Sequence, residues 1–498
     1  MNSFKKQILL FTLPLLTILP LLLFLTTHTQ AGDDPPRYHR LSHMGPDGDI
    51  LYAGINPAIT YNTVDEQFLV VWQADDDTDL LVDEEFEIYG QLIDARTGQE
   101  IGPDDFRISF MALDGNNLIN ADDPAVAYNP VDNEYLVVWS ADNNIFPQVD
   151  GEFEIFVQRV AANGELIADP IKISDMGPDG DPIYDARNPE VVYNPTDHEY
   201  LVIWEGDDNS NDLIEGEFEI YGQRLTAPDA IELAPNDFRI SDMGPDGFSL
   251  YDATSPAVVY NELANEYFVV WEGDDDIEGA SEIYGQRLTA TGIETDTNDF
   301  RITTVGFITD TTYDAINPSV AFNPLTNEYL VIWEGDNDTI STMVEGESEI
   351  WGQRLTANPL TEIGPNDFRI THMGPDGDPT FDAVSPEISY IPTYNHYVVL
   401  WDGEHNRTPY VEGEHDAFVQ TLSATGDKLG RIGSRITDIG LAGSQLYDAA
   451  DPAFHYDPIR RHFLLVWQGD DTNSDDEIEI YGQFFYETST YIPAIWSP

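Results

Sequence analysis

The sequence contains no cysteine and has few bases: 21 Lys and Arg residues stand against 92 Asp and Glu residues. Without cysteine there is no disulfide, no thiol nucleophile and no thiolate metal site, so the core must hold the fold. The formal net charge of −71 repels nucleic acid and anionic membranes and attracts metal cations and basic partners. Adaptation to high salt is an equal alternative that would require no specific ligand.

Long hydrophobic runs are also absent, except at the N-terminus. Two lysines, Lys5 and Lys6, precede an apolar stretch over residues 8–25, which gives way to small and polar residues before Ala31. This pattern predicts a secretory signal peptide over residues 1–31 and a secreted or cell-envelope protein that does not insert into a membrane after cleavage. An uncleaved anchor is the alternative, because the run is nearly long enough to span a bilayer. Two prolines that interrupt the run favour cleavage.

Tryptophan reveals a repeat of about 66 residues, a period typical of stacked repeat architectures. Each of these residues ends an apolar run such as Tyr-Leu-Val-Val-Trp, which predicts a strand that is buried on both faces. The positions are Trp72, Trp139, Trp204, Trp271, Trp333, Trp401 and Trp467. Their place at the ends of apolar strands favours core packing over ligand stacking.

Three further segments recur around each tryptophan run. A Pro-x-Val-x-Tyr-Asn segment precedes the run, an Ile-Tyr-Gly-Gln-Arg-Leu segment follows it, and a short Phe-Arg-Ile segment ends the unit. All three are rich in β-branched and aromatic residues and are bounded by Gly, Pro, Asn and Asp, which is typical of strands and turns. The sequence therefore predicts an all-β, seven-bladed β-propeller with four antiparallel strands per blade.

The count of fourth strands predicts how the ring closes. No Arg-Ile-Ser segment follows the last third strand, yet Arg40-Leu41-Ser42 stands alone before the first blade. We expect this N-terminal strand to complete the last blade, so that the propeller spans residues 32–486 and a C-terminal tail spans 487–498. Several arginines recur at fixed strand positions, where we expect structural ion pairs.

Acidic residues concentrate in the loops of one face. Antiparallel blades place the loop after the second strand and the loop before the first strand at the same end, and both loops are rich in Asp and Glu. Hard cations such as calcium take six to eight oxygen ligands and would relieve the repulsion. We therefore predict calcium sites in some blades, with a solvated acidic rim as the alternative. The candidate ligands are Asp207, Asp208, Glu219, Asp274, Asp275, Glu282, Asp470, Asp471 and Glu479.

No catalytic constellation is evident, because no Ser-His-Asp order, nucleophile elbow or His-rich zinc motif occurs. An enzyme could still use paired carboxylates at the mouth of the channel for glycoside cleavage. The aspartates before each first strand could form that mouth: Asp185, Asp252, Asp314, Asp382 and Asp448. They recur in blade after blade, however, whereas a catalytic site usually breaks a repeat. The loop of the sixth blade departs most, with His405, Arg407 and His415.

The Asn-Glu-Tyr-Leu-Val-Val-Trp segment at 133–139 and the Ile-Tyr-Gly-Gln-Arg-Leu segment at 220–225 resemble a broad group of secreted bacterial repeat proteins. In that group such units are read as propeller blades, and most members have no assigned activity. The resemblance covers about residues 38–486 and implies the fold but no reaction. The present chain differs in its longer and more acidic loops.

From these patterns we predict a secreted, monomeric, non-enzymatic propeller that binds a protein or glycan partner, either basic or bridged by a cation. Calcium is the only cofactor that the composition suggests. A secreted polysaccharide hydrolase or lyase with its site at the channel mouth is the alternative function.

Overall fold

The computed structural model describes residues 38–45, 50–75, 85–111, 116–142, 149, 151–178, 180–208, 213–274, 281–305, 313–336, 343–344, 346–404, 413–437, 448–471, 474–486 and 494–495. The segment predicted as a signal peptide lies outside these residues. Secondary structure in the described residues is entirely β, and none of them forms a helix that could cross a bilayer.

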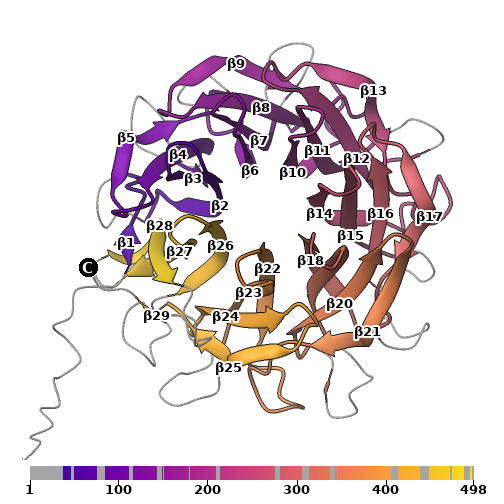
Figure 1. Ribbon diagram of the computed structural model, residues 1–498. Coiled ribbons are helices and arrows are strands. Elements are labelled where there is room, and N and C mark those ends of the chain that lie inside the picture. Colours follow the sequence, from indigo (N-terminus) through magenta and orange to yellow (C-terminus); the bar gives the residue numbers. More distant parts are fainter. Residues whose placement is uncertain are drawn as a thin grey trace, which may run out of the picture. The chain divides into compact units, whose positions relative to one another are not determined.

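Seven sheets, each built from consecutive antiparallel strands, form the blades. The first strands, innermost in Figure 1, are β2 (Gly54–Asn62), β6 (Ala121–Asn129), β10 (Ala186–Asn194), β14 (Ala253–Asn261), β18 (Ala315–Asn323), β22 (Ala383–Ile391) and β26 (Ala449–Asp457). The second strands are β3 (Gln67–Ala74), β7 (Glu134–Asp142), β11 (Glu199–Asp207), β15 (Glu266–Gly273), β19 (Glu328–Gly335), β23 (His396–Gly403) and β27 (His462–Asp471). The third strands are β4 (Glu87–Asp94), β8 (Phe153–Ala161), β12 (Phe218–Thr226), β16 (Glu282–Thr289), β20 (Glu349–Ala357), β24 (Asp416–Ser423) and β28 (Ser474–Tyr486). The outer strands are β5 (Glu100–Arg107), β9 (Leu166–Lys172), β13 (Glu232–Arg239), β17 (Glu294–Arg301), β21 (Leu360–Arg369) and β25 (Lys428–Arg435), joined in the seventh blade by β1 (His39–Arg40).

The ring closes as the sequence predicted. Each inner strand contacts the inner strands of its two neighbours, and β2 of the first blade contacts β26 of the seventh. Strand β1 pairs with β28 in the register His39↔Gly482 and Arg40↔Tyr481. The predicted seven-bladed propeller, closed by its N-terminal strand, is confirmed.

The C-terminal segment also contributes to the seventh blade. Strand β29 (Ala494–Ile495) pairs with β28 at Phe485 and Tyr486, next to the part of β28 that β1 covers. The two ends of the chain thus share the outer position that a single strand fills in every other blade (Figure 1).

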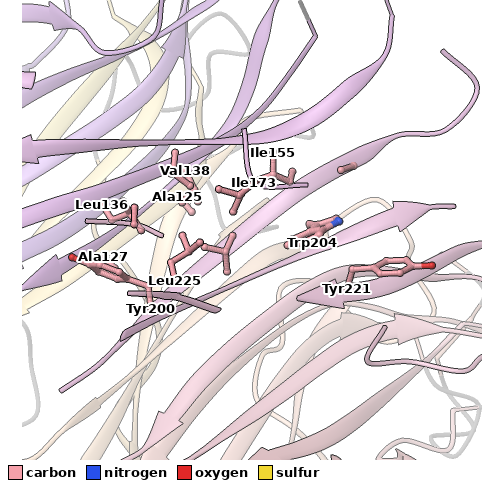
Figure 2. Close-up of a cluster of buried hydrophobic side chains, with 14 of the residues drawn as sticks. Ala125, Ala127, Leu136, Val138, Ile155, Ile173, Tyr200, Trp204, Tyr221 and Leu225 are labelled. Carbon is pink, nitrogen blue, oxygen red and sulfur yellow. The ribbon is translucent and has the colours of Figure 1, made fainter. Parts of the chain in front are cut away.

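The core lies between the faces of adjacent blades. All seven tryptophans of the repeat are fully buried, as expected for core residues. Figure 2 shows one such layer, in which Leu136 and Val138 of the second blade pack against Tyr200 and Trp204 of the third. Trp204 also stacks on Tyr221, with ring centroids 6.5 Å apart. Burial of both faces of every sheet explains why the second strands carry no alternation of polar residues.

An ion pair between a buried carboxylate and a base, partly exposed in most blades, recurs in every blade, near the start of the third strand. In the third blade, Glu219 accepts a hydrogen bond from Arg239 Nη2 at 2.7 Å and from the backbone N–H of Met243 at 3.0 Å. The carboxylates are Glu87, Glu154, Glu219, Glu282, Glu349, Asp416 and Glu479, and the bases are Arg107, Lys172, Arg239, Arg301, Arg369, Arg435 and Arg40. The seventh pair includes Arg40 of β1, so the closing strand makes the same contact as the others.

Candidate functional site

The inner strands share a bulge near their first residues. Each contains a Pro preceded by a residue with φ between 46° and 53°, and the pairing with the second strand shifts at this point. The residues in this left-handed conformation are Asn56, Asp123, Asn188, Ser255, Asn317, Ser385 and Asp451. Pro has no N–H for the ladder, and Asn, Asp and Ser are short and polar, so the local sequence favours a bulge. Bulges re-aim side chains and are common beside functional sites.

The preceding blade holds the free N–H group of this bulge. Ser255 N–H donates to Glu205 at 2.8 Å, and Ser385 N–H donates to Glu334 at 2.7 Å. Across the closure, Asn56 N–H donates to Gln468 at 2.8 Å. These bonds connect the bulges of the first, fourth and sixth blades to the second strands of their preceding blades.

The bulges line a central cavity of about 600 Å³. The residue that follows the bulge proline is small in five blades: Ala58, Ala125, Ala257, Ser319 and Ala453. In the third and sixth blades this residue is Glu190 and Glu387, and both glutamates line the cavity. Two carboxyl groups therefore break the sevenfold repeat at the same position.

Both glutamates have strongly raised pKa values. The Glu190 side chain is exposed on the wall of the cavity, and its position inside the ring, away from bulk solvent, raises its pKa to about 7. Burial raises the pKa of Glu387 to about 8, and the negative charge of Glu190 adds to this effect. The backbone N–H of Phe454 donates to Glu387 Oε2 at 3.2 Å and opposes the shift. Both carboxyl groups therefore have pKa values near neutral pH, and burial is the main cause for each.

Other polar groups surround the pair. Asp123 and Asp451 belong to the cavity lining, and Asp451 Oδ1 lies 3.3 Å from Ser385 Oγ, within hydrogen-bond distance. Beside the cavity, burial raises the pKa of Asp122 to about 7, and the neighbouring charge of Asp123 adds to this rise. Carboxyl groups with raised pKa values in one cleft are typical of sites that transfer protons.

The aspartates that we considered for the channel mouth have another role. Each accepts a hydrogen bond from a backbone N–H at or just before the third strand of the preceding blade, for example Phe218 N–H to Asp252 at 3.0 Å and Ser348 N–H to Asp382 at 3.1 Å. Asp185, Asp314 and Asp448 make the equivalent contact. These residues brace adjacent blades, which explains their repetition.

Several predicted calcium ligands make contacts within their own blade. Glu219, Glu282 and Glu479 pair with the bases described above. Asp207 accepts a hydrogen bond from Gly216 N–H at 2.6 Å, and Asp470 accepts one from Asp448 N–H at 3.0 Å.

Of the remaining predicted calcium ligands, two make hydrogen bonds within the protein. Asp208 accepts a hydrogen bond from Gly177 N–H at 3.1 Å, and Asp274 N–H donates to the Asp252 carbonyl oxygen at 3.2 Å. Asp275 and the side chain of Asp471 lie outside the described residues. In the described part of the chain no three His, Asp or Glu residues are grouped so that they could hold a metal ion. The calcium site stays a prediction.

Sequence reasoning missed Glu190 and Glu387. The signal was present, because an alignment of the seven Pro-x positions shows Ala or Ser in five blades and Glu in two. Only ring closure, however, brings the third and sixth blades to one cavity.

A scan against protein-family models finds no match, and a search of curated proteins finds none. Among solved structures, an α-L-arabinanase of Penicillium chrysogenum complexed with arabinobiose is 13% identical with a TM-score of 0.44, over 73% of this chain and 92% of that chain. An α-L-arabinofuranosidase of Fusarium graminearum with arabinobiose is 14% identical with a TM-score of 0.45, over 73% and 92%. A Hadza microbial sialidase is 13% identical with a TM-score of 0.43, over 73% and 66%. Similarity at this level concerns the fold.

The prediction of a non-enzymatic binding propeller was wrong. The solved structures that resemble the chain include several glycoside hydrolases, and that likeness concerns the fold. The inference against an enzyme depended on finding no carboxyl groups that break the repeat, and Glu190 and Glu387 at the cavity do break it.

Proposed function

We propose that this propeller hydrolyses glycosidic bonds in its central cavity, with Glu190 and Glu387 as the two carboxyl groups. The single observation that carries the proposal is their occurrence at a repeat position that is otherwise Ala or Ser, in a cavity large enough for sugar rings.

Glycoside hydrolysis requires one protonated and one ionised carboxyl group on opposite sides of the scissile bond. Two interacting groups with pKa values of about 7 and 8 hold at least one proton between them at neutral pH. One group then protonates the leaving oxygen while the other, once ionised, attacks the sugar or activates water. Like charges that cannot both ionise are a recurrent way to divide these two roles.

Contacts of the inner strand β22 keep Glu387 in place. Glu387 follows a bulge whose N–H is held by Glu334, and its carboxylate accepts a hydrogen bond from Phe454 in the next blade. The neighbouring Ile388 N–H donates to Ser319 Oγ of the preceding blade at 3.3 Å. A rigid inner strand therefore presents the carboxyl group, which suits a site that must hold reacting groups in position.

The test uses a panel of soluble polysaccharides that includes arabinan, xylan and chitosan, with the release of new reducing ends as the readout. We expect cleavage of at least one polymer, and a loss of about 10²–10⁴-fold in rate for Glu190→Gln and for Glu387→Gln. The control is Glu262→Gln, which changes an exposed carboxylate in the turn between β14 and β15 and should retain the wild-type rate.

If no polymer is cleaved, or if both cavity variants keep the wild-type rate, the proposal fails. For an active polymer, proton NMR of the first product gives its anomeric configuration. Retention would mean that one glutamate attacks the sugar directly, and inversion would mean that it activates water.

A further inference from the structure

A histidine between two carboxylates distinguishes the sixth blade. His415 directly precedes β24, and its Nδ1 lies 2.9 Å from Asp402 Oδ1 on β23. Its Nε2 lies 3.0 Å from Glu404 Oε1, and its backbone N–H donates to Asp448 Oδ1, just before β26, at 3.1 Å. One residue thus connects the end of the second strand to the start of the next blade.

No other blade has this arrangement. The residues at the equivalent position are Phe86, Phe153, Phe218, Ser281, Ser348 and Ile478. In the fourth blade, Ser281 Oγ lies 3.2 Å from Glu272, which is the equivalent of Asp402. A hydroxyl group can bind one carboxylate there, whereas the imidazole ring of His415 reaches two.

With both carboxylates ionised, the geometry favours a charged ring. Neutral imidazole has one N–H donor, so both nitrogens can donate to carboxylates only when the ring is protonated. The acidic groups that act on this region are Asp402 of β23, Glu404, Asp448, Asp382 before β22 and Asp451 of β26. The hydrogen bond to Asp402 raises the pKa of His415 to about 9, against the opposing effect of burial.

This charge lies beside one side of the cavity. Asp402 and His415 both act electrostatically on Asp451, which lines the cavity. In the third blade a permanent cation lies beside the cavity lining: Arg187 of β10 pairs with Asp185 at 3.2 Å and opposes the rise that burial causes in the pKa of Asp123. Arginine stays charged at every accessible pH, whereas histidine does not.

We propose that His415 is a proton-dependent ion-pair bridge: its imidazolium joins Asp402 at the end of β23 to Glu404 within the sixth blade and adds positive charge on that side of the central cavity. Loss of the proton removes one donor and leaves Asp402 or Glu404 without its bond to the ring. The bridge does not depend on whether the cavity is catalytic, since it follows from contacts within the sixth blade.

The first test is an NMR titration of protein with ¹³C-labelled histidine, in which the His415 signal is assigned by its absence in His415→Ser. Serine is the residue of the fourth and fifth blades at this position, so the variant restores an arrangement that the fold already uses. We expect the His415 signal to titrate above pH 8 and its midpoint to fall by at least one pH unit in Asp402→Asn. An ordinary midpoint near 6.5, or no response to Asp402→Asn, would overturn the proposal.

The second test compares the melting temperatures of wild type and His415→Ser across pH. A histidine whose pKa is higher in the folded state stabilises the fold fully below its unfolded pKa and loses this effect as pH rises through the folded value. The variant should therefore melt lower than wild type at pH 6, and the difference should shrink toward zero by pH 10. A difference in melting temperature that is the same at both pH values would contradict the proposed ion-pair bridge.

Discussion

Replacing Glu387 with glutamine removes a charge from the cavity while keeping the shape of the side chain. Glutamine still offers a carbonyl oxygen to the N–H of Phe454, which lies 3.2 Å from Glu387 Oε2. The change therefore isolates the cost of an ionised carboxyl group in this place. Because burial and the charge of Glu190 both disfavour ionisation, we expect the variant to be more stable than wild type at alkaline pH.

The magnitude follows from linkage. A carboxyl group whose pKa is about 8 in the folded state and 4.5 in the unfolded state would lower the free energy of unfolding by about 4 kcal/mol at pH 8. Glu387 is only partly buried and borders cavity water, so we discount this figure to about 1–2 kcal/mol. For a chain of this length, 1 kcal/mol corresponds to about 1 °C in melting temperature.

The sign of the pH dependence is definite. A folded pKa above the unfolded one leaves stability intact below pH 4.5 and reduces it as pH rises toward 8. Differential scanning calorimetry of wild type and Glu387→Gln at pH 4, 6 and 8 should give no difference at pH 4 and a gain of about 1–2 °C at pH 8. Glu262→Gln, on an exposed turn, is the control and should show no such trend. A variant that melts lower than wild type at pH 8 would refute the reasoning.

Three further predictions concern closure, metal and export. Arg40→Ala should lower the free energy of unfolding by about 2 kcal/mol in chemical denaturation, because the buried Glu479 would lose its charged partner and keep only its bonds from Ser42 and Met44; a change below about 0.5 kcal/mol, the size of a surface substitution, would contradict closure by β1. Calcium added to chelator-treated protein should raise the melting temperature if the acidic loops bind it, and an unchanged value would remove the predicted calcium sites. N-terminal sequencing of the exported protein should begin after Ala31, whereas an intact N-terminus would favour the anchor.

Much of the fold was readable because propeller blades are local units. The tryptophan period, the segments bounded by turns and the isolated Arg40-Leu41-Ser42 were enough to predict seven blades and the closing strand. The contribution of β29 was not predicted, since residues 494–495 do not resemble the outer strand of any other blade. Such a pairing depends on the free edge that the short β1 leaves on β28.

Less of the candidate site than of the fold could be predicted from the sequence. The sequence determined the bulge and its neighbours through local chemistry: proline without an N–H, a short polar residue before it and small residues after it. It also contained the two exceptions, Glu190 and Glu387, but without any indication that they face one cavity. Only the closed ring decides that, because closure converts positions three blades apart along the chain into walls of the same cavity. Their raised pKa values have the same origin, since removal from bulk solvent, and for Glu387 the charge of Glu190, exist only once the blades are assembled.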